Sequence, residues 1–379
     1  MTRPYQVCTR CVMDTSDPQI TFDEEGVCSH CHKFEVETRR RWFPNAEGER
    51  LWAEKLDEIK AAGRAKEYDC IIGLSGGVDS SYLALRAKEW GLRPLVVHVD
   101  AGWNSELAVS NVETIVKACG YDLHTIVIDW EEMRDLQLSY LKSGVSNQDV
   151  PQDHAFFASL YRYAVRNNVN YVMSGGNIAT EGIFPDSWHG SAMDAINLKA
   201  IHRRFGTRAL KAYPTVSFLE YYLTYPFVHG MRTVRPLNFM KYDKQQAVDT
   251  LVSIGWRPYG RKHGESRFTK LFQNYYLPER FGYDKRRPHL SSLIVSGQIS
   301  RDEAAESLEE HLYAAKDLDS DLAYFCKKLG ISRDDFARYM AGPKRSYSDF
   351  ANWDGMQRAI KQAQQLYRRV RGRDVRIYS

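Results

Sequence analysis

The sequence lacks any long hydrophobic run. No segment approaches the roughly 18 consecutive apolar residues that cross a bilayer, and the opening stretch MTRPYQVC lacks the apolar core of a secretory signal peptide. We therefore expect no membrane span and a cytoplasmic location. The chain has 379 residues, of which 43% are hydrophobic, so it can build a sizeable core and has a length typical of about two or three domains.

A strong net charge is also absent. The formal net charge of +4 is too small to favour nucleic acid as a partner. The positive charge is nevertheless concentrated, because nine Lys or Arg residues and three acidic residues lie between Arg257 and Arg287. We expect this segment to hold an anionic ligand.

The cysteines do not form a disulfide framework, which a reducing cytoplasm would not sustain. Four of the seven lie in the first 31 residues, as Cys8-x2-Cys11 and Cys28-x2-Cys31. Two such pairs give the tetrahedral thiolate set that zinc prefers, and four thiolates leave no open position for chemistry. We predict a structural zinc ribbon in which His30 and His32 are not ligands. An iron–sulfur cluster also uses four cysteines, so spacing alone leaves the metal open.

Internal repeats and low-complexity segments are absent, so changes of pattern divide the chain. We predict a zinc-ribbon module over 1–35, a charged helical connector over 36–66, an α/β domain over 67–240, and a region over 241–379 that is first basic and aromatic and then helical. In the last region Ser300 and Ser332 each precede an acidic third position and are typical helix caps, and Gly330 suits a helix end.

The central region alternates short apolar runs with helical patterns. The runs DCIIGL, PLVVHV, LHTIVI and YVMSGG predict strands, and helices are expected over 77–90, over 104–119 and after Pro151. Nearly continuous apolar strands that alternate with helices predict a doubly wound parallel sheet. Ligands then bind at the carboxyl ends of the strands.

The first of these strands ends in a loop without the lysine of a Walker motif. The stretch SGGVDSS supplies two glycines that let the backbone approach an anion, and a helix start whose N–H groups favour phosphate. The hydroxyls of Ser75, Ser80 and Ser81 add donors. Asp79 would repel phosphate directly, so we expect it to hold Mg²⁺. The alternative is a plain strand-to-helix turn.

SGGVDSS resembles the signature of the PP-loop ATP pyrophosphatases, which split ATP between the α and β phosphates and transfer AMP. VVHVDAG and SGGNIATEG stand where that family builds its pocket, and the second resembles the G-x-x-N-x-x-E stretch of NAD synthetase. The resemblance implies that Glu181, with Asp79, serves Mg²⁺. It also implies an ATP site made of Ser75, Gly76, Gly77, Val78, Asp79, Ser80, Ser81, His98, Asp100, Gly175 and Asn177, with Thr180 beside it. Asn177 and Glu181 could instead be an ordinary helix cap and its dipole-matched acid.

The basic segment combines aromatic and cationic residues. Phe268, Leu271, Phe272 and Tyr275 follow helical spacing and are expected in the core. The polar residues at its other positions could hold polyphosphate, a carboxylate or a sugar nucleotide, or could bind single-stranded nucleic acid or simply face solvent. These residues are Lys262, His263, Glu265, Arg267, Lys270, Asn274, Lys285, Arg286 and Arg287.

Over nearly its full length the chain resembles the N-acetyl sugar amidotransferases of surface-polysaccharide biosynthesis. The resemblance rests on CTRCVMDT, GVCSHC, GLSGGVDSS, VHVDAGWNSELA, SGGNIATE, KHGESRFTK and DKRRPHLSSLIVSGQI. It implies conversion of an acetamido group on a nucleotide-linked sugar, such as a diacetamido uronic acid, into an acetamidino group, with ammonia from a glutaminase that works with a cyclase-like subunit. The implied catalytic residues are Asp79, Glu181, Lys262, Lys285 and Arg286, and the implied substrate residues are His263, Glu265, Arg267, Lys270 and Arg287.

Two other functions fit parts of the sequence. A tRNA-modifying thiolase of the PP-loop group would need a reactive cysteine, yet Cys70, Cys119 and Cys326 look like packing residues. A thiolase whose four clustered cysteines hold an iron–sulfur cluster stays open. A zinc-ribbon binding module without catalysis is the other alternative, and the intact loop from Ser75 to Ser81 argues against it.

Overall fold

A five-stranded parallel sheet forms the centre of the computed structural model, which describes residues 3–259 and 266–371, with side chains to residue 365. The strand order is β3-β2-β1-β4-β5, and every neighbouring pair is parallel. The strands are β1 (Cys70–Gly73), β2 (Pro94–Asp100), β3 (Leu123–Val127), β4 (Tyr171–Met173) and β5 (Arg232–Val234). The predicted α/β class is confirmed. Because β1 lies between β2 and β4, the loops that follow β1 and β4 are neighbours at the carboxyl edge of the sheet.

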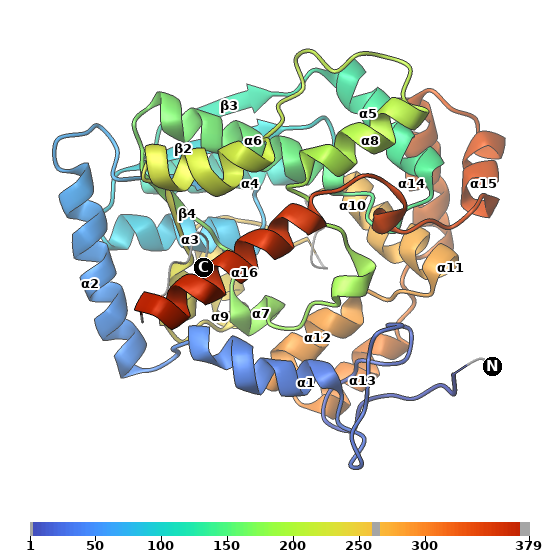
Figure 1. Cartoon of the computed structure of the whole chain (residues 1–379), viewed down its shortest axis with the longest axis horizontal. Helices are drawn as coiled ribbons and strands as arrows, with labels where there is room; N and C mark the ends of the chain where they lie inside the picture. Colours follow the sequence, from blue (N-terminus) through green and yellow to red (C-terminus); the bar gives the residue numbers. More distant parts are fainter. Residues whose placement is uncertain (1–2, 260–265, 372–379) are drawn as a thin grey trace.

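Helices connect and cover these strands (Figure 1). They are α3 (Val78–Glu89), α4 (Glu106–Cys119), α5 (Trp130–Ser143), α6 (Val150–Arg166), α7 (Ile178–Glu181), α8 (Ala195–Phe205) and α9 (Lys244–Ser253). The helices expected over 77–90, over 104–119 and around Pro151 are therefore confirmed. The α4 helix begins at a Ser105 cap and ends at Gly120, whose φ of 70° suits a left-handed helix end.

The segment before the sheet is helical only in part. It contains α1 (Ser29–Lys33), a π-helical turn over Phe34–Thr38, a 3-10 turn over Arg39–Arg41 and α2 (Ala46–Gly63). The expected connector helix over 36–66 is thus wrong between residues 42 and 45. Pro44 disfavours helix at the residue before it, and the Asn45 side chain accepts a hydrogen bond from Gly48 N at 3.2 Å, which starts a new helix.

The C-terminal part is helical, as expected. It contains α10 (Arg267–Leu271), a π-helical turn over Phe272–Tyr276, α11 (Leu277–Phe281), α12 (Arg286–Val295), α13 (Arg301–Glu309), α14 (Ala315–Leu329), α15 (Arg333–Ala341) and α16 (Asp354–Arg371). Ser300 and Ser332 each form a capping box, with Glu303 and Asp335, and Gly330 has a φ of 69°. These three predictions are confirmed.

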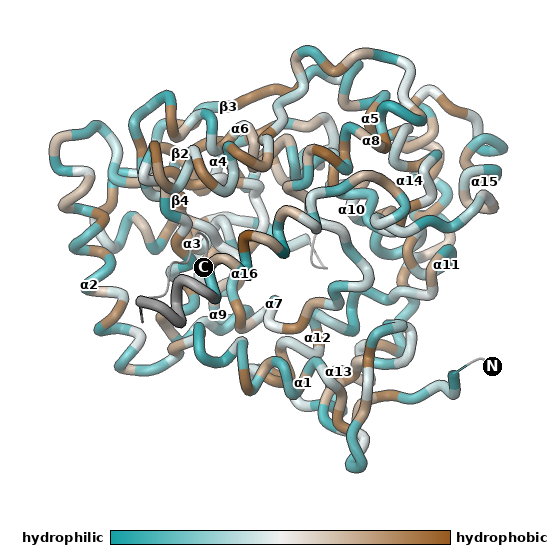
Figure 2. The backbone as a smooth tube through the Cα atoms, viewed as in Figure 1, coloured by the Kyte–Doolittle hydropathy of each residue, from teal (hydrophilic) through white to brown (hydrophobic). Residues whose placement is uncertain are grey.

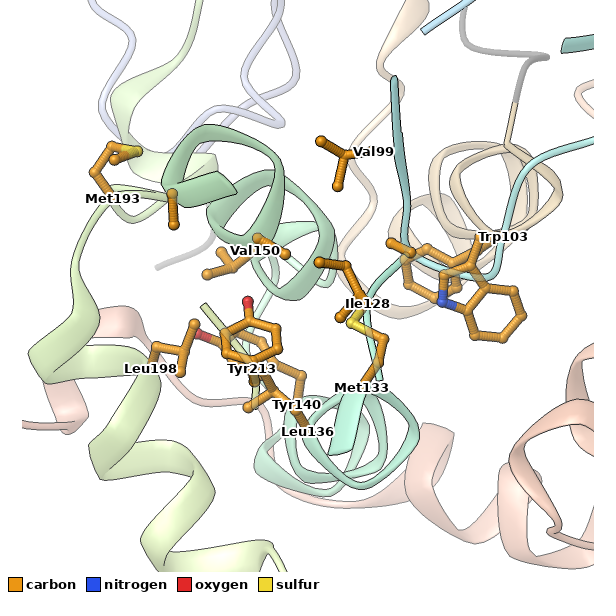
Figure 3. Close-up of a cluster of buried hydrophobic side chains, with 14 of the residues drawn as sticks. Val99, Trp103, Ile128, Met133, Leu136, Tyr140, Val150, Met193, Leu198 and Tyr213 are labelled. Carbon is orange, nitrogen blue, oxygen red and sulfur yellow. The ribbon is translucent and has the colours of Figure 1, made fainter. Parts of the chain in front are cut away.

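One large hydrophobic cluster joins the sheet to helices from both halves of the chain. Its members run from Ile71 in β1 to Trp353 before α16. Figure 3 shows part of it, where Met133, Leu136 and Tyr140 of α5 face Val150 and Leu198. Phe268, Leu271 and Phe272 belong to this cluster, so their expected core position is confirmed, and Tyr275 packs against it half-buried. The predicted domain limits stay predictions.

Hydropathy follows this arrangement. Figure 2 shows that hydrophilic and hydrophobic residues alternate along the helices around the sheet. Within residues 3–259 and 266–371, no helix combines the length and the apolar character that a membrane span requires.

Candidate active site at the carboxyl ends of the strands

Four cysteine sulfurs converge near the N-terminus. The Sγ atoms of Cys8, Cys11, Cys28 and Cys31 all lie within 4.8 Å of one another, and all four residues are fully buried. The Cys11–Cys28 and Cys28–Cys31 Sγ distances are both 3.7 Å, close to the separation of about 3.8 Å that a tetrahedral site with Zn–S bonds of about 2.3 Å requires. The donor set therefore fits Zn²⁺, and its four thiolates make a closed, structural site.

Hydrogen bonds around the cysteines suit thiolates rather than thiols. Backbone N–H groups donate to the sulfurs, among them Cys28 N to Cys8 Sγ at 3.2 Å. The neighbouring histidines are bound elsewhere, because His30 Nε2 lies 2.6 Å from Asp17 and His32 Nε2 lies 2.7 Å from Asp23. Both histidines fall outside the four-cysteine cluster, as expected.

The cysteine module is fixed to the C-terminal helices. The Arg301 guanidinium donates to the carbonyl oxygens of Cys8 and Cys11, and Ser291 Oγ accepts from Val12 N at 3.2 Å. Arg287 pairs with buried Asp14 at 2.9 Å and also donates to Val12 O. Arg287, expected to bind substrate, therefore joins the ribbon to α12.

The loop after β1 is held by its own hydroxyls. Ser75 Oγ and Ser80 Oγ are 3.1 Å apart, Gly77 N donates to Ser75 Oγ, and Ser80 Oγ donates to Gly77 O. Trp256 Nε1 and the Tyr259 hydroxyl both donate to Gly76 O at 2.9 Å. These bonds keep the loop folded around the start of α3, where the helix N–H groups favour an anion.

Two glycines are required where this loop meets its neighbours. Gly76 has a φ of 86°, and a Cβ there would lie 2.6 Å from Ala108 O. A Cβ on Gly175, in the loop after β4, would lie 2.8 Å from Asp79 O and 2.9 Å from Ser80 N. The two strand-end loops therefore touch backbone to backbone, which brings the two predicted motifs together.

Asp79 and Glu181 line a common cavity of about 560 Å³ with Ser75, Gly77, Val78, Ser80, Gly175 and Thr180; we call it the phosphate-loop cavity. Asp79 Oδ1 accepts hydrogen bonds from the Tyr242 hydroxyl at 2.5 Å and from Asn177 Nδ2 at 3.2 Å. Burial and the nearby carboxylates of Asp79 and Glu181 raise the pKa of Tyr242 far above its usual value, so the Tyr242 hydroxyl keeps its proton and remains a donor. Two carboxylates in one cavity fit Mg²⁺, which prefers oxygen ligands.

Asn177 also caps α7, with Oδ1 accepting from Thr180 N at 3.0 Å. The Asn177 side chain therefore caps α7, as the alternative prediction stated, and it also donates a hydrogen bond to Asp79. Of the other predicted ATP residues, Gly76 and Ser81 do not line this cavity, and Ser81 is fully buried. Asp100 accepts from Gly102 N and from Asn104 Nδ2.

A second cavity of about 680 Å³ adjoins the first and shares Ser75, Phe156, Glu181 and Arg235 with it. We call it the amide-rich cavity, because Asn104, Asn147, Gln152, Asn177 and Gln273 line it. His98 lines it too; its Nδ1 donates to Leu74 O at 2.8 Å and its Nε2 accepts from Asn104 at 3.0 Å. His98 therefore lies on the side of Ser75 opposite the phosphate-loop cavity.

Lys285 is the predicted catalytic cation that reaches this cavity. It is buried, its Nζ donates to His189 Nε2 at 2.9 Å, and it lies 4.9 Å from the centre of the Phe184 ring. Burial and the Lys285 ammonium lower the pKa of His189 well below its usual value, so His189 accepts this bond as a neutral ring.

Other predicted cations are engaged elsewhere. Arg286 pairs with Asp284 at 2.7 Å and donates to the carbonyls of residues 307, 308 and 310, which end α13. Arg267 and Lys270 both pair with buried Asp321, at 2.7 and 3.0 Å. Their substrate or catalytic roles stay predictions that the geometry does not favour. Lys262, His263 and Glu265 lie outside the described residues.

The isolated cysteines are packing residues, as expected. Cys70, Cys119 and Cys326 are buried, and burial raises the pKa of each thiol. None of them lines either cavity. A thiolate nucleophile is therefore not available from these three side chains.

Arg235 also belongs to this site, although no motif in the sequence pointed to it. It directly follows β5, is exposed, and lines both cavities. The position of a charged residue immediately after a short strand was the available signal, because ligands gather at the carboxyl ends of parallel strands.

Three comparisons with known proteins bear on this arrangement. A family described as "LPS biosynthesis protein WbpG-like, C-terminal domain" matches residues 265–366. A search of curated proteins finds no match. An NH3-dependent NAD synthetase from Campylobacter jejuni, in complex with the nitrate ion, is 16% identical with a TM-score of 0.28, over 41% of this chain and 72% of that one. An NMN synthetase from Francisella tularensis is 16% identical with a TM-score of 0.34, over 70% and 98%.

Both structural scores are low, so the site rests on this chain's own geometry. The family match covers the segment that contains Lys285, Arg286 and Arg287, and it confirms over those residues the predicted likeness to surface-polysaccharide biosynthesis proteins. Over residues 265–366, the chain is similar to the C-terminal domain of the WbpG-like LPS biosynthesis proteins.

Proposed function

We propose that the protein is an ATP-dependent amidotransferase that converts an acetamido group of a nucleotide-linked sugar into an acetamidino group and releases AMP and pyrophosphate. One observation carries the proposal. Glu181 and Ser75 line both the phosphate-loop cavity and the amide-rich cavity, so ATP and a polar acceptor can meet across a shared wall.

The chemistry needs an activated oxygen because an amide oxygen is a poor leaving group. The acetamido oxygen attacks the α phosphorus of ATP, the bond to the bridging oxygen breaks, and pyrophosphate leaves. Ammonia then attacks the imidate carbon and loses a proton, and the C–O bond breaks to release AMP. No nucleophilic side chain is consumed, which agrees with the buried, high-pKa state of Cys70 and Cys119.

This chain's residues would position and stabilise the reacting groups. The N–H groups of the Ser75–Ser80 loop face the phosphates, and Asp79 and Glu181 would hold Mg²⁺, which neutralises charge as pyrophosphate departs. Lys285 would orient the acceptor from the other side. Ammonia would come from a separate glutaminase that works with a cyclase-like subunit.

The proposal is tested with ATP, Mg²⁺, ammonium and diacetamido sugar nucleotides. We expect AMP and pyrophosphate to form only when the acceptor is present, and mass spectrometry to find a product in which NH replaces oxygen. ADP and phosphate, or AMP formation that ignores the acceptor, would contradict it.

The thiolase alternative has a separate signature. A thiolase with an iron–sulfur cluster at Cys8, Cys11, Cys28 and Cys31 would be brown and sensitive to oxygen, whereas the proposed enzyme is colourless and contains zinc. Metal analysis of the purified protein distinguishes the two.

A further inference from the structure

A third cavity meets the other two at Glu181 and Arg235. It measures about 810 Å³, lies between the N-terminal turns and the sheet, and is lined by Arg40, Arg41 and Phe43 on one side and by Arg232 and Arg235 on the other. We call it the arginine cavity. Because Glu181 and Arg235 line all three cavities, ligands in the three would meet at these two side chains.

The arginine cavity is strongly positive. Six Lys or Arg residues line it, against the acidic residues Glu181 and Asp186. Three of the six are paired with acidic residues, since Lys33 pairs with Asp186 and both Lys55 and Arg232 pair with Glu58. Arg40, Arg41 and Arg235 form no ion pair within the part of the chain that the structure describes. Three uncompensated guanidinium groups around one cavity match a ligand with several phosphate oxygens.

The amide-rich cavity on the other side of Phe184 has a different chemistry. Amide side chains such as Asn147 and Gln152 can donate to and accept from hydroxyl and acetamido groups, and Phe184 lines both cavities as an apolar face. Phe184 is fixed by His189, whose ring stacks on it at 4.3 Å between centroids. The two cavities also share Ile178 and Ile183, so one elongated ligand can cross from one to the other.

We propose that a sugar linked to a nucleoside diphosphate spans these two cavities, with its diphosphate on Arg40, Arg41 and Arg235 and its sugar in the amide-rich cavity. The acetamido group then lies beside Glu181, next to the ATP site. The inference rests on the proposed function for the class of acceptor, and it assigns the acceptor's binding site, including residues outside the sheet.

The separation of charge between the cavities supports this orientation. The diphosphate would avoid the carboxylates Asp149 and Asp153, which line only the amide-rich cavity.

The test is calorimetric titration of the full-length, zinc-loaded protein with UDP, GDP, CDP and dTDP, with α,β-methylene ATP present to fill the ATP site. We expect at least one nucleoside diphosphate to bind under these conditions. Arg40→Ala with Arg41→Ala, or Arg235→Ala alone, should weaken it by at least about tenfold. Arg39→Ala is the matched control, because Arg39 lies in the same 3-10 turn but pairs with Glu35 at 2.9 Å and does not line the cavity.

Several results would overturn the assignment. These are an absence of binding by all four diphosphates, displacement of the diphosphate by α,β-methylene ATP, an equal loss in Arg39→Ala, or stronger competition by a short single-stranded RNA. The acceptor-dependent AMP assay separates this inference from the proposed function. Arginine-dependent binding without AMP formation overturns only the function, and AMP formation with an unchanged acceptor KM in the arginine variants overturns only the site.

Discussion

Asp79 lies where the loops after β1 and β4 converge. Its Oδ1 is held by Tyr242 and Asn177, and its carbonyl is in close contact with Gly175. A carboxylate fixed by two donors keeps one orientation toward the cavity, which a metal ligand needs. The residue thus links the two strand-end motifs and the segment before α9 in one small network.

We predict that Asp79→Asn abolishes most AMP formation and leaves the fold intact. Asparagine keeps the shape and can accept the Tyr242 hydrogen bond, but it lacks the charge that holds Mg²⁺, so turnover should fall at least about a hundredfold. Tyr242→Phe is the control, since it removes one donor and keeps the charge, and it should cost about tenfold or less. Wild-type turnover in Asp79→Asn would contradict the assigned role, with circular dichroism confirming the fold.

One buried histidine, His154, makes the folding stability of the protein depend on pH in the acid range. Its Nδ1 donates to Ala192 O at 2.9 Å and its Nε2 accepts from Val216 N at 3.1 Å, so the buried ring is neutral. Burial lowers the pKa of His154 to about 4, below the unfolded value of about 6.5. The stabilisation that it provides is therefore fully present above about pH 6.5 and is lost as the pH falls toward 4.

We predict that unfolding measured in denaturant shows this loss. Between pH 7 and pH 5 the free energy of unfolding should fall by roughly 2 kcal/mol more in the wild type than in His154→Gln. Glutamine can replace both hydrogen bonds without titrating. Equal pH slopes for the two proteins would show that His154 does not titrate on unfolding.

At the scale of elements, the four-cysteine module supports the candidate active site from outside. Ile183 packs in the cluster that contains the four cysteines, and it lies two residues after Glu181. Ser292 Oγ accepts from Ile183 N at 2.9 Å, which joins the same segment to α12. Figure 1 shows α1, α7 and α12 gathered in this part of the molecule.

We predict that removal of zinc, by a chelator or by Cys28→Ser, lowers the midpoint of thermal unfolding and reduces turnover. The buried thiolates lose the cation that neutralises them, so the ribbon unfolds and releases the segment after Glu181. Binding of α,β-methylene ATP should persist, because the Ser75–Ser80 loop is held by Trp256 and Tyr259, which follow α9. Loss of zinc without a change in the unfolding midpoint would contradict this coupling.

Local signals in the sequence predicted the elements well. Apolar runs located β1 to β4, capping boxes located α13 and α15, and cysteine spacing located the metal cluster. The break before α2 was missed although Pro44 and Asn45 signal it. The π-helical turn over Phe272–Tyr276 carries no comparable signal, since its aromatic spacing also suits a regular helix.

Ion pairing between distant segments could not be predicted in the same way. Arg287 is paired with Asp14, which is far away in sequence, and Arg267 and Lys270 are paired with Asp321. A basic run in a sequence shows where charge is available, but tertiary contacts decide which charges are neutralised. Arg235 is the opposite case, since no motif in the sequence marks this residue and yet it lines all three cavities.

At the scale of the whole molecule, two adjoining cavities lie on either side of one wall at the carboxyl edge of the sheet. The loops after β1 and β4 line the phosphate-loop cavity, which we propose for ATP, the amide-rich cavity is proposed for the acceptor, and Glu181 lines both. The N-terminal turns line the arginine cavity and the C-terminal helices line the amide-rich cavity, so the proposed reaction would need separate segments of the chain.

Direct transfer of AMP to the amide oxygen is the central claim, and a heavy-oxygen label tests it. The acceptor is prepared with heavy oxygen in its acetamido carbonyl and is incubated with the protein, ATP, Mg²⁺ and ammonium. The label should leave with the nucleotide, so mass spectrometry should find it in the phosphate of AMP and not in the amidine product, pyrophosphate or water. Unlabelled AMP alongside amidine product would contradict the claim.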